Sequence, residues 1–137
     1  MEVKKTLKEL GIKPVRGQNF LISEPVVTSL VEEGEVEGQE VLEIGAGTGV
    51  ITEKLSEGAE KVYAVEKNTV LAEHLKDRFG ETENVQVEEE DILQYDFSGF
   101  DRCVSNLPFQ LTSKILEKLG ENQVQSALIV QNELADK

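Results

Sequence analysis

Four consecutive residues, Asn106-Leu107-Pro108-Phe109, have types and an order that suit chemistry on an aromatic amine. The side-chain oxygen of Asn106 and a backbone carbonyl held by Pro108 can accept both N–H bonds of an adenine amino group. This pairing frees the nitrogen lone pair, which is otherwise delocalised into the ring, to attack an activated methyl group. Phe109 can stack on a base that has been turned out of its helix. The alternative interpretation is a plain turn, because Asn-x-Pro sequences often end strands.

A glycine-rich segment, Glu43–Gly49, is the second candidate site. Its glycines at positions 45, 47 and 49 allow a sharp turn and a close approach of the backbone to a ligand. A dinucleotide-binding loop would have its third glycine at position 50, which is Val50 here. The spacing of Gly45, Gly47 and Gly49 instead fits the loop of S-adenosylmethionine-dependent methyltransferases. A tight turn without a ligand is the alternative.

Two carboxylates follow predicted strands and suit the other parts of such a cofactor. Glu66 ends a strand and can accept both hydroxyl protons of a ribose. Asp91 and the adjacent Ile92 suit the amine and the face of an adenine ring. Both acids have a simpler interpretation as solvated surface residues, since Lys67 follows Glu66 and Asp91 ends a run of four acids.

These candidates lie at the ends of segments whose patterns predict alternating strands and helices. Ser23 and Asn68 are typical helix caps, and Gly34 and Gly80 are typical helix ends. The alternation predicts a doubly wound, mainly parallel α/β sheet, in which ligands bind beyond the carboxyl ends of the strands. The expected strands are 41–44, 61–66, 85–87, 103–105 and 127–130. The expected helices are 23–34, a segment from the glycine loop to 55, 68–80 and 112–119, with the first turn of another at 132–137.

Length and composition limit the class of protein. A chain of 137 residues suits one domain, and without a run of 18 apolar residues it is not expected to span a membrane. The first residues lack the apolar core of a secretory signal. Cys103 is the single cysteine, which excludes an intrachain disulfide framework and a cysteine-cluster zinc site. We therefore expect a cytoplasmic protein without a bound metal, in which Cys103 packs in the core and His74 lies at the surface.

The charge distribution bears on nucleic-acid binding. A net charge of −13, from 27 acidic and 14 basic residues, argues against a protein that binds phosphates. The charge is uneven, however, because residues 1–20 hold five cations and two anions. An acidic body with a basic N-terminal arm weakens the case for an RNA ligand without excluding it.

Five segments together give the chain a resemblance to a known family. They are, in order, Arg16-Gly17-Gln18-Asn19-Phe20-Leu21, Glu43–Gly49, Glu66, Asp91 and Ser105-Asn106-Leu107-Pro108-Phe109-Gln110. In residues 14–137 the chain resembles the ribosomal RNA adenine N6,N6-dimethyltransferases of the KsgA type, and the last segment is most similar to archaeal and eukaryotic members. The resemblance implies a Rossmann-like class I methyltransferase fold and S-adenosylmethionine as cofactor. It also implies dimethylation of two adjacent adenosines in small-subunit rRNA or a pre-ribosomal subunit, as part of ribosome biogenesis.

The resemblance also implies roles for individual residues. In the family, the motif that contains Gln18, Asn19 and Leu21 closes over the methionine end of the cofactor. The other implied cofactor contacts are Gly45, Gly47, Gly49, Glu66, Asp91, Ile92 and Asn106. The implied catalytic residues are Asn106 and Pro108, which hold the target amine, and Phe109, which occupies a stacking position that is usually tyrosine in the family.

The resemblance predicts two parts and leaves alternatives open. Residues 1–22 would be a basic arm with the cofactor-closing motif, and residues 23–137 a truncated catalytic domain without the last strands and the helical C-terminal domain. Strand 127–130 would then be an open apolar edge, available for self-association or for a second chain. The alternatives are a cofactor-binding half that is inactive alone and a methyltransferase for another amine, such as a protein glutamine or a small molecule. A nicotinamide dehydrogenase is disfavoured by Val50.

Overall fold

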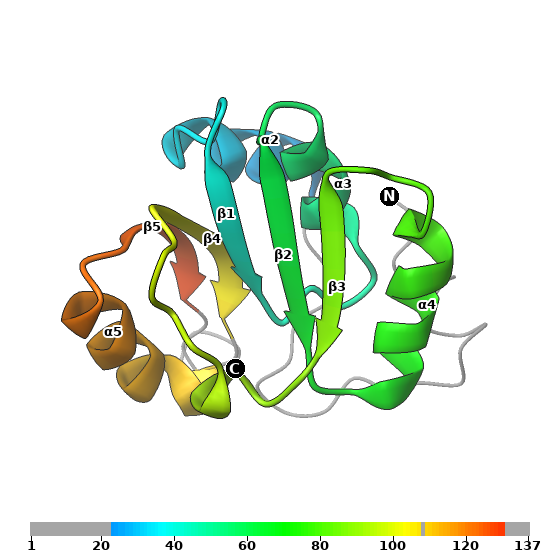
Figure 1. Cartoon of the computed structure of the whole chain (residues 1–137). Coiled ribbons are helices and arrows are strands. Elements are labelled where there is room, and N and C mark those ends of the chain that lie inside the picture. Colours follow the sequence, from blue (N-terminus) through cyan, green and yellow to red (C-terminus); the bar gives the residue numbers. More distant parts are fainter. Residues whose placement is uncertain (1–22, 108, 131–137) are drawn as a thin grey trace.

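Five parallel strands form one sheet in the computed structural model, which describes residues 23–107 and 109–130 (Figure 1). The strand order is β3-β2-β1-β4-β5, and each neighbouring pair runs parallel. The strand bounds are β1 Glu40–Ile44, β2 Lys61–Glu66, β3 Val85–Glu89, β4 Arg102–Leu107 and β5 Gln125–Val130. This order, with helices between the strands, confirms the predicted doubly wound α/β fold.

Helices cover both faces of this sheet, and each face has its own core. One face packs against α2 (Glu24–Glu33), α3 (Val50–Ser56) and α4 (Thr69–Phe79). The other face packs against α5 (Thr112–Glu121) and the β3–β4 connection, which contains the short helix η1 (Ile92–Gln94). Another short helix, η2 (Phe109–Leu111), links β4 to α5. In Figure 1, α4 stands beside β3 at one side of the sheet and α5 lies at the other.

Side-chain caps begin three of these helices. The Ser23 hydroxyl accepts a hydrogen bond from Val26 N at 3.4 Å, and Asn68 Oδ1 accepts one from Leu71 N at 3.0 Å. Both residues were expected caps, and each satisfies an amide that the first turn leaves without a partner. Asp91 caps η1 in the same way, since its Oδ1 accepts from Leu93 N at 3.0 Å.

Four strands are longer than the sequence pattern predicts, and two of them, β3 and β4, are extended at their carboxyl ends. β3 continues past Val87 through two acidic residues to Glu89, and β4 continues past Ser105 to Leu107, so that it contains Asn106. Pairing with β2 extends β3, because Glu89 is in register with Glu66. Since β3 is at an edge of the described sheet, its glutamates can keep their side chains in solvent while their backbone is paired.

The two expectations for individual side chains have different outcomes. Cys103 is fully buried in the core, as predicted. His74 on α4 is half-buried, so its side chain is less exposed than the predicted surface position implies. The expected helical turn at 132–137 lies outside the described residues.

Lys118 on α5 holds the β3–β4 connection against the sheet. Its ammonium donates to the carbonyls of Ile92, Leu93 and Tyr95. The same nitrogen lies 4.4 Å from the centroid of the buried Phe97 ring. A cation that satisfies several carbonyls at the end of a short helix stabilises that end.

Within residues 23–107 and 109–130, no helix has both the length and the apolar character needed to cross a membrane.

Candidate active site

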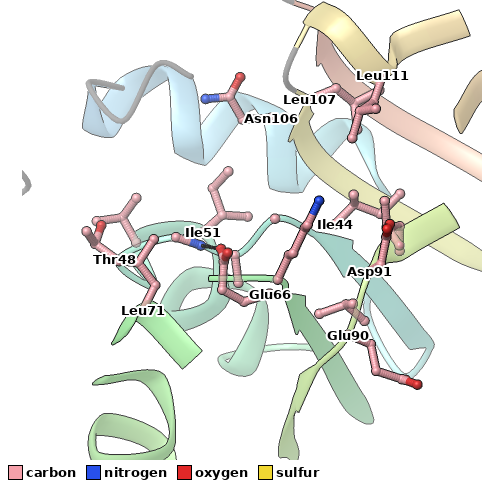
Figure 2. Close-up of a pocket in the computed structure, with 17 residues that line it drawn as sticks. Ile44, Thr48, Ile51, Glu66, Leu71, Glu90, Asp91, Asn106, Leu107 and Leu111 are labelled. Atoms are coloured by element: carbon pink, nitrogen blue, oxygen red, sulfur yellow. Dashed lines mark hydrogen bonds between the residues drawn. The ribbon is translucent and has the colours of Figure 1, made fainter. Parts of the chain in front are cut away.

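A pocket of about 160 Å³ lies at the carboxyl ends of the central strands (Figure 2). Its lining comes from the glycine loop, the end of β2, the start of α4, the segment after β3 and the end of β4. Six predicted site residues line it: Gly45, Gly47, Glu66, Asp91, Ile92 and Asn106. Figure 2 shows Asn106 on the opposite side of the pocket from Glu66.

The pocket opens where β1 and β4 separate. These strands pair only at Val41 with Arg102 and at Leu42 with Cys103, whereas β4 and β5 pair over their whole length. Beyond that point, the Ile44 amide donates to the hydroxyl of the buried Ser105 at 2.7 Å instead of to a β4 carbonyl. The strand order reverses between these two strands, and ligands of open α/β sheets bind at such reversals.

Gly45 lines the pocket with backbone atoms alone and leaves the space beside it empty. Its backbone φ is +67°, and a Cβ built on it meets no heavy atom within 4 Å. Because Gly45 lines the pocket, a side chain at this position would extend into the space a ligand needs. The loop therefore fits a cofactor that packs closely against its backbone.

Gly49 has a different role from Gly45, although both were predicted cofactor residues. Its φ is +92°, and a Cβ would lie 2.8 Å from Cε2 of Phe79 on α4. Gly49 is not among the residues that line the pocket. The glycine at this position is required by the close packing of the start of α3 on α4.

We expect alanine at these two glycines to separate ligand binding from stability. Both variants have a left-handed backbone, which costs roughly 1–2 kcal/mol for a non-glycine residue. Gly49→Ala adds the clash with Phe79 and should lower the free energy of unfolding by about 2–4 kcal/mol in total. Gly45→Ala should have a free energy of unfolding closer to that of wild type. Its affinity for S-adenosylmethionine should be at least about tenfold lower, because the added methyl group occupies space in the pocket. Denaturant unfolding and calorimetric titration of both variants check this, and equal affinity losses would contradict it.

Glu66 is held in place by two backbone amides. The residue is 8% exposed, its Oε1 accepts from Gly47 N at 2.8 Å, and its Oε2 accepts from Asn68 N at 2.9 Å. Each carboxylate oxygen has a further lone pair, so both can still accept a hydroxyl proton. The carboxylate therefore joins the glycine loop to the start of α4 and has capacity for a diol.

Asp91 and Ile92 form another wall. One oxygen of Asp91 caps η1, and Ile92 is buried in the core while one part of it lines the pocket. Leu71 at the start of α4 and Leu111 at the end of η2 add apolar surface that sequence reasoning missed. The signal for Leu71 was its place as the first of the apolar residues that recur every four positions along α4, before Leu75 and Phe79.

Glu43 is a buried acid behind the glycine loop and was not singled out from the sequence. It is 1% exposed and accepts a short hydrogen bond from the Thr52 hydroxyl on α3. Burial, opposed in part by the Thr52 hydrogen bond and reinforced by the charge of Glu66, raises the pKa of Glu43 to about 8. The carboxyl is therefore mostly protonated at neutral pH.

Two further charged residues line the pocket, and several predicted residues lie outside the described part of the chain. Lys67 and Glu90 belong to the lining, and Figure 2 shows that the Glu90 carboxylate points away from the other labelled side chains. Predicted residues that lie outside the described part of the chain are Gln18, Asn19, Leu21, Pro108 and the side chain of Phe109.

Comparisons with known proteins agree with one family. A family model described as "Ribosomal RNA adenine dimethylase" matches residues 11–137. A "Probable ribosomal RNA small subunit methyltransferase A" from Thermococcus onnurineus is 44% identical over 123 residues, which are 88% of this chain and 45% of the relative. The chain thus spans about half the length of the curated relatives it matches.

Two solved structures extend the similarity to three dimensions. The crystal structure of the 23S rRNA methyltransferase ErmE aligns with a TM-score of 0.76 and 27% identity, over 87% of this chain and 50% of that one. A dimethyladenosine transferase from Plasmodium falciparum aligns with a TM-score of 0.74 and 28% identity, over 85% of this chain and 44% of that one.

Proposed function

Because the chain belongs to the ribosomal RNA adenine dimethylase family, we propose that it transfers methyl groups from S-adenosylmethionine to the N6 atom of adenine in rRNA. The observation that carries this proposal is the convergence of Gly45, Glu66, Asp91 and Asn106 on one pocket. Gly45, Glu66 and Asp91 come from segments suited to the different parts of an adenosyl cofactor. Asn106 can accept a hydrogen bond from the target amine. The family description and the names of the relatives favour small-subunit rRNA as the substrate and dimethylation as the outcome.

The cofactor would lie along the carboxyl ends of β1 and β2. Gly45 and Gly47 provide a wall without side chains, Glu66 accepts the ribose hydroxyls, and Asp91 with Ile92 holds the adenine. We assign the methionine end to the arm at residues 1–22, through Gln18, Asn19 and Leu21. Gly49 supports the loop through its packing on α4.

The chain's own residues position and polarise the amine. The Asn106 side chain, at the opening between β1 and β4, would accept one N–H bond of the target nitrogen, and the backbone carbonyl before Pro108 the other. Phe109 would stack on the extruded base. When bound, the cofactor supplies a methyl group that is already activated by a sulfonium. The protein therefore mainly needs to provide in-line geometry and to exclude water.

Transfer of labelled methyl groups to small ribosomal subunits that lack the modification tests the proposal. We expect label to enter adenosine as N6-methylated products, and fully modified subunits to accept none. Calorimetric titration with S-adenosylmethionine, with NAD as control, tests the cofactor separately. Binding of NAD in place of S-adenosylmethionine would contradict the proposal, and so would label confined to protein or small molecules.

A second candidate function is a cofactor-binding part that becomes active on assembly with another chain. The observation that favours it is the position of β5 at an edge of the described sheet, with β4 as its neighbour. Residues 23–130 also carry 23 acidic and 8 basic residues, which disfavours RNA binding by this part alone. Methyl transfer by the isolated chain, together with a monomeric mass in solution, would exclude this candidate. For either function we place the reaction in the cytoplasm.

A further inference from the structure

Glu43 is a buried acid beside the proposed cofactor site, and the proposed reaction gives it no role. It is the fourth residue of β1 and is 1% exposed. Within the described residues its carboxyl group has one hydrogen-bond partner, the Thr52 hydroxyl. An ionised carboxylate in solution accepts several hydrogen bonds from water, and a single hydroxyl does not replace them. Burial therefore favours the protonated form of Glu43.

Among residues 23–107 and 109–130, no positively charged side chain forms an ion pair with Glu43 to compensate for this burial. The described ion pairs, Lys54–Glu57 and Arg78–Glu53, do not include it. The titratable groups that act on it are the Glu66 carboxylate at the end of β2 and the Cys103 thiol on β4. Burial raises the pKa of Cys103 to about 12, so this thiol is neutral, and within the described part of the chain Glu66 is the charge that acts on Glu43.

Glu43 lies next to residues that line the pocket, although it does not line the pocket itself. The next residues in β1 and its loop, Ile44 and Gly45, line the pocket, as does Ile51, the neighbour of Thr52 (Figure 2). Glu66, whose charge raises the pKa of Glu43, lines the pocket as well. Ile44 and Ile51 are buried and apolar, so a charge in the pocket is weakly screened from Glu43.

We propose that Glu43 is a specificity-determining residue that senses the charge of the cofactor, because its carboxyl releases a proton when a sulfonium binds in the pocket. The inference rests on the proposed function. In the step, the O–H bond of the acid breaks, its electron pair stays on the carboxylate, and the proton passes to the buffer. Demethylation converts the sulfonium to a neutral thioether, after which Glu43 takes up a proton again.

This coupling favours the methyl donor over the spent product. Ionisation of the buried Glu43 is unfavourable by itself. Attraction between its carboxylate and a sulfonium offsets this free energy, whereas the neutral thioether product provides no such attraction. Proton release therefore makes the preference for the methyl donor dependent on pH. The ratio of the two affinities should rise with pH between about 6 and 8, by at most about tenfold per pH unit.

Calorimetry in buffers of different ionisation enthalpy counts the protons. S-adenosylmethionine and S-adenosylhomocysteine carry the same amine and carboxylate, so their difference isolates the sulfonium. At pH 7 we expect wild type to release close to one proton more with the first ligand than with the second. Glu43→Gln, which keeps the shape of the side chain, should bind both ligands without this difference. Equal release for the two ligands in wild type, or an undiminished difference in Glu43→Gln, would overturn the inference.

Two further measurements keep the test decisive. Thr52→Val removes the hydrogen bond that lowers the pKa of Glu43, so the pH range of proton release should move upward. This variant decides the question if Glu43→Gln does not fold, and an unchanged pH range would count against the proposal. If wild type binds neither ligand, the proposed function fails. If it binds both with equal proton release, only the role of Glu43 fails.

Discussion

Replacement of Asn106 by alanine is expected to reduce methyl transfer by about 10²–10³-fold while the chain stays folded. The side chain lies at the end of β4 on the pocket wall, where it would accept an N–H bond of the target amine. Loss of one preorganised hydrogen-bonding group in an active site typically costs this much, because the polarised amine is stabilised mainly in the transition state. Cofactor affinity should fall by less than about tenfold, since Asn106 is only one of several proposed cofactor contacts.

Single-turnover methyl transfer and calorimetric binding, measured on the same preparation, separate these two effects. Asn106→Asp keeps an acceptor oxygen and should retain more activity than Asn106→Ala. Asn122→Ala is the matched control, because Asn122 is exposed at the end of α5, donates to the Lys118 carbonyl and does not line the pocket. Wild-type rates in Asn106→Ala would show that the amine is not activated in this way.

Glu66→Gln is the second variant with a large expected effect, on both cofactor affinity and stability. Each carboxylate oxygen accepts one backbone amide, from Gly47 and from Asn68. A glutamine can offer only one oxygen, so its NH₂ group must face an N–H donor whichever way it is turned. An unsatisfied buried donor costs about 1–3 kcal/mol, and the free energy of unfolding should fall by this amount.

The affinity for S-adenosylmethionine should fall further, by about 10–100-fold, because the ribose also loses one of its two acceptors. Chemical denaturation and calorimetric titration measure the two losses. Glu73→Gln on the exposed face of α4 removes the same charge without a buried partner, so it should leave both quantities close to wild type. An affinity for Glu66→Gln equal to that of Glu73→Gln would contradict the assignment of the ribose contact.

The fold and most of the pocket could be predicted because they depend on local patterns. Apolar runs and the Ser23 and Asn68 caps gave the elements within a few residues of their observed bounds. A parallel sheet brings all carboxyl ends to one edge. Glu66, Asp91 and Asn106, which follow or end three different strands, were therefore expected to meet, and they do line one pocket.

Contacts that depend on register and on long-range packing could not be predicted. The Ser105 hydroxyl accepts a hydrogen bond from the amide of Ile44, 61 residues away in the sequence. This contact forms because β1 and β4 no longer pair beyond Leu42 and Cys103. Similarly, the sequence indicates a cofactor contact for Gly49. The structure shows instead that the ring of Phe79 leaves no room for a side chain at this position, which the sequence could not reveal. The length of β3 was underestimated because pairing with β2 outweighs the low strand preference of its glutamates.

The contacts of Lys118 have a consequence for the order in which the pocket assembles during folding. The lysine is 23 to 26 residues from the carbonyls to which it donates, and these carbonyls belong to the segment that starts at Ile92 on the pocket wall. That segment contains the single helical turn η1, so we expect its order to depend on the docking of α5. We therefore expect one side of the pocket to be completed after the β1–β2–β3 half of the sheet, so that a ligand that contacts both sides would bind only the fully folded domain.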